Sequence, residues 1–432
     1  MLKTPGNQLR TRMIERQYDV VLYGASGFTG RQTIQYFARN TRSSDVRWAI
    51  AGRNRQALEA AREQAGENAR AAEILVADAQ DQPAVDAIVS KTRILLSTAG
   101  PFSLYGNKIV DACVRYRTHY VDITGEISWV RDLIDRYHDR AAADGTRIIP
   151  CCGFDSIPSD LGTYLVVRHL QKALGIDCRE VKSFYQIRGG LNGGTFASAS
   201  NQQASGQSER MREPFLLNPP KARSAEELKL NRDPREARFD ADIGAWSTPF
   251  VMGMANTRII RRSAGLFEQW NQSYGSEFRY QEYQKFLPPM ARAKAFAMLA
   301  ALGALQAALQ SSLGRRLMKS LAPKPGEGPS QNTMDNGFFR CDLVGIAPDG
   351  RKLYGVVSDK GDPGNRATVK FLCESALSLA LNADRLPGGQ ERGGVLTPAT
   401  GLGDVLVERL RKAGMRLETS EEGPFVSSVR TS

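Results

Sequence analysis

The sequence predicts an α/β protein with a doubly wound parallel sheet in its N-terminal part. A second α+β domain containing a mixed or antiparallel sheet is expected in the rest. Three observations predict this fold class. Strand-like apolar runs alternate with helical patterns from residue 18 to 151, which is typical of parallel βαβ units. A glycine-rich turn joins the first strand to the first helix. After about residue 155 the pattern changes to that of antiparallel hairpins.

Hydrophobic periodicity defines the elements of the N-terminal part. The strand-like runs are 19–23, 46–51, 73–77, 93–97, 119–122 and 146–150, and the helical stretches are 29–40, 55–66, 82–90, 106–117 and 128–143. In the first helix, Ile34, Phe37 and Ala38 recur on one face. Asp81 followed by Pro83 marks the start of another helix. Right-handed crossovers between parallel strands then give a sheet of the Rossmann type.

Antiparallel signals dominate the rest of the chain. Residues 179–190 predict a strand, and residues 340–359 predict a hairpin that turns at 348–350. One helix is expected over 401–413. The expected units are a tail (1–16), the parallel-sheet domain (17–155), a substrate and dimerisation domain (156–390), a segment that closes on the first domain (391–415) and a tail (416–432).

Composition limits the classes of partner. The 432 residues are enough for two domains, and 41% of them are hydrophobic. The net charge of +12 favours acidic partners such as coenzyme A, an acidic carrier protein or an anionic membrane, although a basic soluble surface explains it equally well. Nucleic acid is excluded because the basic residues are dispersed and no reading module occurs. Six scattered cysteines and three histidines predict a reduced cytoplasmic protein without a metal site. The N-terminus lacks the apolar core of a secretion signal.

The segment 295–309 is unusually apolar. Its unbroken run of about 11 residues is too short to span a bilayer, which takes about 20. Basic residues flank it, with Arg292 and Lys294 before and Arg315 after. A buried helix is the simplest expectation. The alternative is a helix that contacts a membrane surface or an acyl chain, which would make the cytoplasmic protein membrane-associated.

The glycine-rich turn predicts a dinucleotide site. Glycines at every third position allow a tight turn and a close approach to a pyrophosphate, and the following helix directs its N-terminal N–H groups at the phosphates. The expected contacts are Gly24, Ala25, Ser26, Gly27, Phe28, Thr29 and Gly30. A purely structural turn is the alternative.

The end of the second strand predicts NADP(H) rather than NAD(H). Gly52 is followed by Arg53 and Asn54, where an NAD-binding chain usually carries a carboxylate for the ribose 2′-hydroxyl. A guanidinium can bind a 2′-phosphate in bidentate fashion. The alternative is that Arg53 and Arg55 are solvated charges. Asp78, after the third strand, either caps a turn or contacts the adenine.

The later strands supply candidates for contact with the nicotinamide half and for catalysis. Loops at the carboxyl ends of parallel strands line the ligand crevice. After the fourth strand the expected cofactor contacts are Thr98, Ala99, Gly100, Pro101 and Phe102. The fifth and sixth strands lead to groups that can handle protons, which are Tyr120, Asp122, Glu126 and Asp155. Of these, Tyr120, Asp122 and Asp155 are the catalytic candidates, although Asp155 can instead cap a helix.

Taken together, the ordered motifs carry a resemblance to a known family. "VVLYGASGFTGR", "AGRN", "STAGPFSLYG", "HYVDITGE" and "GFDSIPSDLG" resemble the saccharopine dehydrogenase-like oxidoreductases, and within them the bacterial trans-acting enoyl reductases. "GGTFASAS" (193–200), "PGEGPS" (325–330) and the stretches 362–380 and 393–403 extend the match. Asn365 stands where the family pattern leads us to expect an aromatic residue.

The resemblance implies an NADP-linked reductase. Trans-acting members reduce an enoyl double bond on a fatty-acyl or polyketide chain that a synthase or acyl carrier protein holds, so an acyl thioester is the expected substrate. A homodimer is expected by family analogy. Two alternatives stay open: an enzyme that reduces an imine or carbonyl compound, for which Arg188, Arg258, Arg261 and Arg262 could bind substrate carboxylates, and a non-catalytic, lipid-associated protein that retains NADP.

Overall fold

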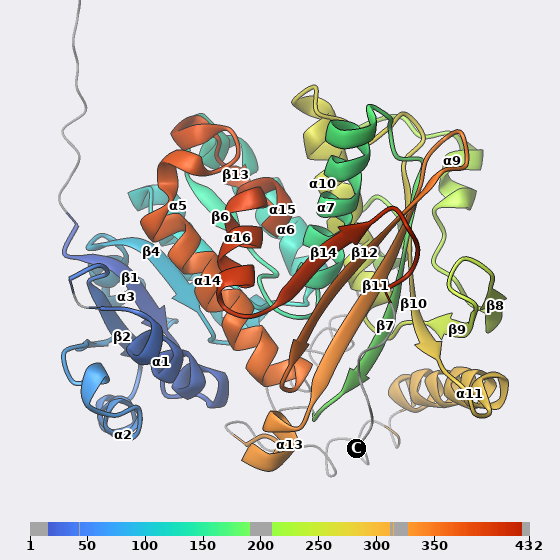
Figure 1. Ribbon diagram of the computed structural model, residues 1–432. Helices are drawn as coiled ribbons and strands as arrows, with labels where there is room; N and C mark the ends of the chain where they lie inside the picture. Colours follow the sequence, from blue (N-terminus) through green and yellow to red (C-terminus); the bar gives the residue numbers. More distant parts are fainter. Residues whose placement is uncertain (1–15, 43, 191–209, 312–313, 315–326, 426–432) are drawn as a thin grey trace, which may run out of the picture.

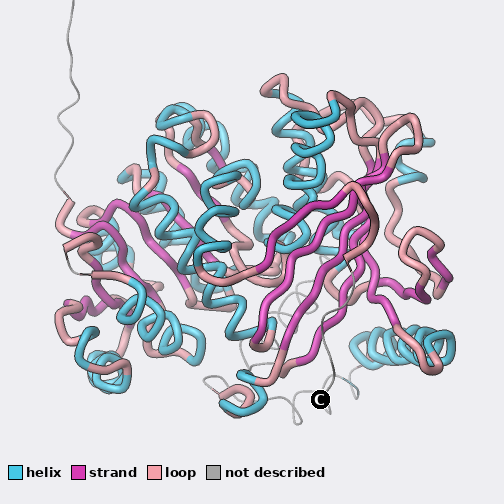
Figure 2. The backbone as a smooth tube through the Cα atoms, viewed as in Figure 1, coloured by secondary structure: helices cyan, strands magenta, loops and turns pink. Residues whose placement is uncertain are grey.

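Two seven-stranded sheets lie side by side in the molecule (Figure 1). The computed structural model describes residues 16–42, 44–190, 210–311, 314 and 327–425. The motif at 193–200 and the first two residues of the motif at 325–330 therefore lie outside the described residues. In Figure 2 the strands form two separate groups with helices around each. Within the described residues, no helix is long and apolar enough to cross a membrane.

The first sheet is entirely parallel, as the sequence predicts. Its order is β13-β6-β5-β4-β1-β2-β3. The strands are β1 (Tyr18–Tyr23), β2 (Trp48–Gly52), β3 (Glu73–Val76), β4 (Thr92–Ser97), β5 (His119–Asp122), β6 (Arg147–Ile149) and β13 (Gly394–Val395). The chain builds outward from β1 through β2 to β3 and then returns to β4 on the other side of β1. The direction in which the chain adds strands therefore reverses between β1 and β4. Doubly wound folds bind their ligands at such a point.

Helices follow each strand of this sheet at the predicted places. They are α1 (Phe28–Asn40), α2 (Arg55–Gln64), α3 (Gln82–Val89), α4 (Phe102–Tyr105), α5 (Asn107–Tyr116) and α6 (Ile127–Ala143), with the short η1 (Glu67–Ala69) after α2. Local capping explains two of the starts. The side chain of Asn54 accepts a hydrogen bond from Ala57 N, and that of Asp81 accepts one from Ala84 N. Pro83 lies in the first turn of α3, which confirms the start expected there.

C-terminal elements complete the first layer. These are α14 (Thr368–Leu381), α15 (Pro398–Gly401) and α16 (Gly403–Lys412), with η4 (Ala383–Arg385) and η5 (Gly389–Glu391) between them. The segment expected to close on the first domain contributes β13, which pairs with β6. Although α14 falls inside the span predicted for the second domain, it packs on α1, β4 and β5. The helix expected over 401–413 is confirmed as α16, and the short α15 precedes it.

The second sheet is mixed. Its order is β14-β12-β11-β7-β10-β9-β8. The strands are β7 (Glu180–Arg188), β8 (Arg238–Asp240), β9 (Ala245–Pro249), β10 (Arg279–Phe286), β11 (Phe338–Ile346), β12 (Lys352–Lys360) and β14 (Arg416–Ser420). The pairing of β7 with β10 is parallel, and every other pairing is antiparallel. The predicted hairpin is confirmed as β11 and β12. Residues 416–432, which the sequence predicts to be a tail, begin with the strand β14, which pairs with β12.

The helices of this second part are α7 (Ile157–Leu174), α9 (Ala225–Leu230), α10 (Gly253–Gln269), α11 (Ala291–Gln310) and α13 (Gln331–Asp335), with η2 (Arg210–Arg212) and η3 (Pro363–Ala367). Small residues bring α7 close to the sheet: a Cβ added at Gly162 would lie 2.9 Å from Leu343, and one added at Gly345 would lie 2.3 Å from Val166. The helix α10 packs on α7 and β10. The expectation of a buried helix over 295–309 is wrong, because α11 lies on β9 and β10 at the outside of the molecule (Figure 1) with most of its described side chains exposed.

Candidate functional site

The glycine turn between β1 and α1 is built so tightly that two of its positions exclude a side chain. Gly24 has a φ of +82°, and a Cβ there would lie 2.9 Å from Ala99 N at the end of β4. A Cβ at Gly30 would lie 2.3 Å from Gly24 O. Both contacts are with backbone atoms, which cannot rotate away. The close approach of the loop after β4 therefore requires Gly24, and the packing of α1 on the turn requires Gly30.

The N-terminus of α1 is open to an anion. Its first intrahelical bond runs from Arg31 N to Gly27 O, so the N–H groups of Phe28, Thr29 and Gly30 precede the hydrogen-bonded part of the helix. Gly27 is exposed, no side chain caps the helix, and its first turn holds no acidic residue. These backbone N–H donors lie at the positive end of the helix dipole, which suits a pyrophosphate.

The ends of β2 and β3 place Arg53 and Asp78 beside this turn. Gly24 N donates to Ala51 O, which puts the end of β2 next to the glycines. Arg53 is exposed and has no hydrogen bond or ion pair with a described residue, whereas Asn54 is occupied as the cap of α2. The Asp78 carboxylate accepts a hydrogen bond from Gln80 N at 2.8 Å, so it caps the turn after β3. The cofactor contacts predicted for Arg53, Asn54 and Asp78 stay predictions.

The loop after β4 packs on the glycine turn and buries its aromatic ring. Thr98 Oγ1 donates to Gly24 O at 3.1 Å and so holds the loop against the glycine turn. The Phe102 side chain is buried and stacks on Trp129, with 5.9 Å between ring centroids. Its ring is therefore not offered to a cofactor. Glu126, predicted as a proton handler, instead accepts hydrogen bonds from Phe102 N at 2.7 Å and Ser103 N at 3.1 Å, which fixes the start of α4.

Tyr120 and Asp122 form a buried pair inside the first sheet. The Tyr120 hydroxyl donates to Asp122 Oδ2 at 2.8 Å. Asp122 Oδ1 accepts from Thr124 N and Cys151 N, so this carboxyl joins the ends of β5 and β6. Burial raises the pKa of Asp122 to about 7. Both side chains are fully buried. The contacts give them a structural role in the sheet, and a catalytic role stays a prediction.

Asp155 differs from Asp122, the other carboxyl predicted to be catalytic, because it has no hydrogen-bond partner among the described residues. It lies partly buried in the loop between β6 and α7. A Cβ added at Gly125 would be 3.7 Å from Asp155 Oδ2 and 3.8 Å from Met252 Cε, so the carboxyl faces the loop after β5 and the start of α10. Burial raises its pKa to about 6. An uncommitted acid of this pKa, at the carboxyl edge of the sheet, can donate a proton near neutral pH.

A buried polar network supports the turn that carries Asp155. Ser156 Oγ donates to Asn256 Oδ1 at 3.1 Å, and Asn256 Nδ2 donates to Glu282 Oε1 at 2.8 Å. Tyr280 donates to the other oxygen of Glu282. Burial raises the pKa of Glu282 to about 7. The sequence alone does not reveal this network, because its members come from the residue before α7, from α10 and from β10.

Segments of the C-terminal half contact both the glycine turn and the turn after β6. A Cβ at Gly328 would lie 2.4 Å from the ring of Phe28 in the glycine turn. At the other end, Phe154 N donates to Thr368 Oγ1 at 3.2 Å. Asn365, the departure from the family pattern, is fully buried and donates to Asp362 Oδ2 at 2.5 Å. Segments between residues 328 and 368 therefore adjoin both the glycine turn and the turn after β6.

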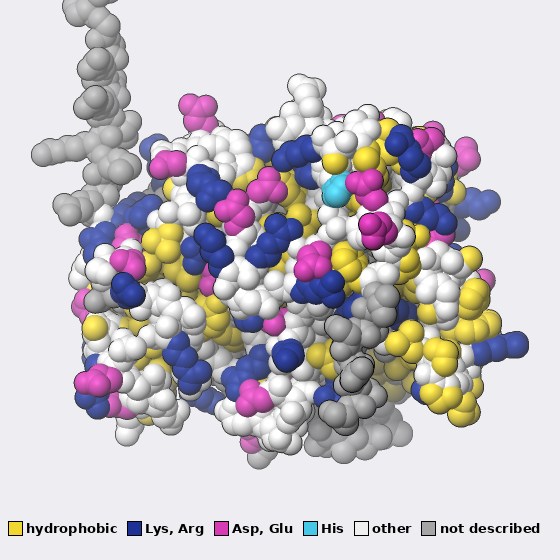
Figure 3. Space-filling model, in the orientation of Figure 1, with side chains coloured by type: hydrophobic (Ala, Val, Ile, Leu, Met, Phe, Trp, Pro, Cys, Tyr) yellow, Lys and Arg dark blue, Asp and Glu magenta, His cyan; other side chains and the backbone are white. Residues whose placement is uncertain are grey.

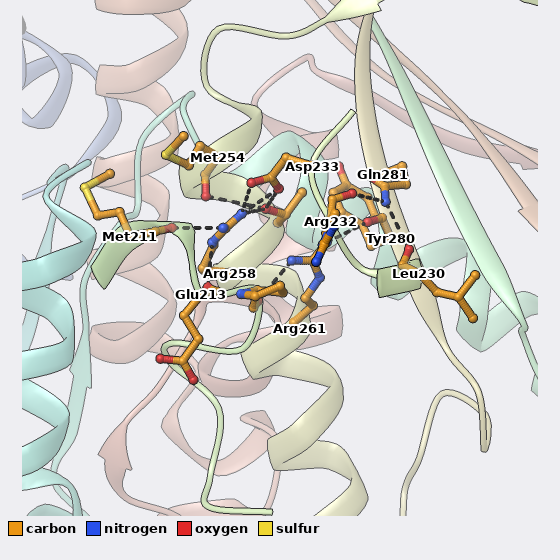
Figure 4. Close-up of polar contacts among 12 residues, drawn as sticks. Met211, Glu213, Leu230, Arg232, Asp233, Met254, Arg258, Arg261, Tyr280 and Gln281 are labelled. Carbon is orange, nitrogen blue, oxygen red and sulfur yellow. Dashed lines mark hydrogen bonds and ion pairs between the residues drawn. The ribbon is translucent and has the colours of Figure 1, made fainter. Parts of the chain in front are cut away.

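Two of the arginines considered for substrate binding serve the fold instead (Figure 4). Arg258 pairs with Asp233 at 2.5 Å and donates to Glu213 O at 3.1 Å. Arg261 donates to Pro214 O at 2.9 Å. Both side chains are at most 2% exposed. They hold the segments on both sides of α9 onto α10. Most of their donors bind the protein, and of these donors only the Nε of Arg261 has no partner among the described residues.

The other two arginines also bind backbone carbonyls, although Arg188 is exposed. Arg262 is buried, and it donates to Val395 O at 3.2 Å and contacts His138 Nδ1 at 3.2 Å. It thus fastens α10 to β13 and α6. Arg188 donates to Asn336 O at 3.0 Å. A pocket of free arginines for a substrate with several carboxylates is therefore not formed by these four residues.

Asp233→Ala is expected to lower the free energy of unfolding by about 3 kcal/mol, because it leaves the buried Arg258 charge without its partner. Urea unfolding followed by circular dichroism measures this change. Glu268→Ala is the control: it breaks an exposed pair with Lys221 and should cost less than about 1 kcal/mol. Equal stability of Asp233→Ala and the wild type would contradict a structural role for Arg258.

Among the described residues, no group of three or more His, Cys, Asp or Glu side chains is arranged to hold a metal ion. The donors that remain at the edge of the first sheet are the α1 N-terminus, Arg53 and Asp155. This set suits a phosphorylated organic cofactor and a proton transfer.

Comparison with known proteins identifies the first domain as an NADP-binding domain. Residues 20–149 match the family model of the saccharopine dehydrogenase NADP-binding domain. A protein of Mycobacterium tuberculosis (strain ATCC 25618 / H37Rv) that is named as a putative trans-acting enoyl reductase is 36% identical over 423 residues, which cover 94% of this chain and 98% of the relative. The trans-acting enoyl reductase of Mycobacterium ulcerans (strain Agy99) is 36% identical over 419 residues, which cover 93% of this chain and 97% of the relative.

Among solved structures, the apo saccharopine dehydrogenase (L-Glu forming) of Saccharomyces cerevisiae is similar in structure. The alignment covers 93% of this chain and 99% of the yeast chain. The identity is 15% and the TM-score is 0.49.

Proposed function

We propose that this chain, which belongs to the saccharopine dehydrogenase-like oxidoreductases and within them to the trans-acting enoyl reductases, reduces the carbon–carbon double bond of an enoyl thioester. It is an NADP-dependent oxidoreductase. The observation that carries the proposal is the place of Asp155: a carboxyl without a hydrogen-bond partner among the described residues, at the sheet edge that also carries the glycine turn.

The acyl chain of the substrate belongs, in this proposal, to fatty-acyl or polyketide lipid synthesis. The names of the relatives support a substrate that a separate synthase makes and holds. The net charge of +12 supports docking of an acidic carrier protein or of the phosphates of coenzyme A. The commitment of Arg258, Arg261 and Arg262 to protein partners removes the reason to prefer a substrate with several carboxylates.

The residues of the chain divide the work between binding and proton transfer. The N–H groups at the start of α1 would bind the pyrophosphate of NADPH, and Arg53 would bind its 2′-phosphate. Bound NADPH supplies a hydride for the β-carbon of the enoyl thioester. Asp155 in its protonated form gives its proton to the α-carbon, which completes the saturated product. Because Asp155 is partly exposed, its carboxylate then regains a proton from solvent.

The proposal predicts consumption of NADPH that depends on an enoyl thioester. Purified protein is mixed with NADPH and trans-2-enoyl thioesters of graded chain length, on coenzyme A and on an acyl carrier protein, and NADPH fluorescence is followed. We expect turnover with a distinct optimum of chain length. Saturated thioesters of the same lengths are the control and should give no decay.

Two outcomes would contradict the proposal. Turnover of imines or ketones with none of the enoyl thioesters would assign the enzyme to another substrate class. NADPH binding without turnover of any of these compounds would mean a binding protein that retains the cofactor site.

A further inference from the structure

The outer helix α11 has an arrangement of side chains that is unusual for a surface helix. A helix on the surface of a soluble protein normally turns polar residues to solvent. Here the exposed residues of the helix between 296 and 307 are almost all apolar, and no charged residue occurs from 295 to its end. The helix is held on the second sheet by Ala295, which is fully buried, and by a contact between Phe296 and Trp246.

Neighbouring segments extend this exposed apolar surface. We call it the α11 patch, and it consists of Phe239, Leu287, Met290, Phe296 and Leu305, which are all at least 38% exposed. Ring contacts join Phe239 to Trp246 at 6.2 Å and Trp246 to Phe296 at 5.9 Å, so the patch is continuous from β8 to α11. Figure 3 shows hydrophobic side chains gathered over this part of the molecule. A large exposed patch of this kind marks an interaction surface.

Positive charge borders the patch at the start of α11. Arg292 lies over the rings of Trp246 and Phe296, at 5.5 and 5.9 Å. Arg292 and Lys294 are exposed and form no ion pair with a described residue. The carboxylates Asp240 and Asp242, at the turn between β8 and β9, are both paired with Lys182. The uncompensated charge at this edge is therefore positive.

We propose that the α11 patch binds the surface of an anionic lipid bilayer. Alanines make up most of the exposed residues of α11, together with Phe296 and Leu305, which suits a uniform apolar medium such as lipid tails better than the shaped pocket of a protein partner. Arg292 and Lys294 lie where headgroup phosphates would be, and Trp246 supplies an aromatic ring at the boundary between the apolar and polar zones. The helix stays packed on β9 and β10, so it lies along the membrane surface. This inference is independent of the substrate proposed above.

Co-sedimentation of the full chain with vesicles tests the proposal. Vesicles of phosphatidylcholine alone are compared with vesicles that also contain phosphatidylglycerol. We expect binding to the anionic vesicles that weakens as salt is raised. Leu305→Glu should weaken this binding about tenfold or more, because it places a charge among the apolar residues of the exposed face. The double variant with Arg292→Ala and Lys294→Ala should lose the preference for anionic vesicles.

The control is Leu381→Glu, which changes a leucine of similar exposure at the end of α14 and should bind as the wild type does. Leu305 takes part in no ring contact and is 38% exposed, so its replacement should not unfold the protein, which circular dichroism checks. Wild-type protein that stays in the supernatant with both vesicle types overturns the proposal. So does equal binding by Leu305→Glu. A dimer in solution that Leu305→Glu dissociates, without vesicle binding, would identify the patch as an interface between two copies of this chain.

Discussion

Asp155→Asn is expected to lower kcat for enoyl thioester reduction by about 10²- to 10⁴-fold, which is the usual contribution of a general acid. Asparagine keeps the size of the side chain but has no acidic proton to give. The dissociation constant of NADPH should change little, because Asp155 lies in the loop after β6, away from the glycine turn. Stopped-flow turnover and a fluorescence titration of NADPH measure the two quantities.

The pH profile gives a second signature of the same role. Only the protonated form of Asp155 can donate, and burial raises its pKa to about 6. The value of kcat/KM should therefore be constant below about pH 6 and fall about tenfold for each pH unit above it. In Asp155→Asn the remaining slow rate should lack this fall.

Asp160 provides a matched control for these experiments. Burial raises its pKa to about 6 as well, but its carboxyl accepts hydrogen bonds from Ser263 Oγ and Ala399 N. Asp160→Asn should therefore affect stability and leave the fall above pH 6 in place. If Asp155→Asn keeps the wild-type profile, or if Asp160→Asn removes the fall, Asp155 is not the proton donor.

The first sheet could be predicted from sequence because its signals are local. Some helix starts there depend on neighbouring residues, such as Asp81 with Pro83. Most of the strands are short apolar runs with buried side chains, although the edge strand β3 is only partly buried. By contrast, β14 carries a single fully buried side chain, Leu417, so its pattern does not differ from that of a polar tail. The apolar run in α11 suggested burial, because sequence cannot tell a helix in the core from one exposed on the surface.

The same distinction holds for the site. Backbone donors at the glycine turn follow from the position of the glycines, so the phosphate site was predictable. The direction of a side chain depends on tertiary contacts that no local pattern contains. Phe102 turns inward onto Trp129, and Glu126 turns toward the backbone of α4. Asp155 and Asp160 lie five residues apart with similar chemistry, and only the structure separates the uncommitted carboxyl from the hydrogen-bonded one.

Arg53→Ala is expected to weaken NADPH binding about 10- to 100-fold, the range for the loss of hydrogen bonds to a charged group, and to leave NADH binding nearly unchanged. Arg53 is exposed at the end of β2, beside the glycine turn, and no described residue occupies its guanidinium by a hydrogen bond or ion pair. Fluorescence titrations with NADPH and NADH give the ratio of the two dissociation constants, which is the quantity that reports on the 2′-phosphate.

Two further variants separate geometry from charge. Arg55→Ala removes an equally exposed arginine that lies near Glu59, at 3.9 Å, and it should leave the ratio close to the wild-type value. Arg53→Lys keeps the charge but loses the planar fork, so its ratio should fall between those of Arg53→Ala and the wild type. Equal losses for both cofactors in Arg53→Ala would mean that this residue supports the turn rather than the 2′-phosphate. A wild-type ratio in Arg53→Lys would mean that the charge alone selects NADPH, since an ammonium group cannot reproduce the bidentate contact.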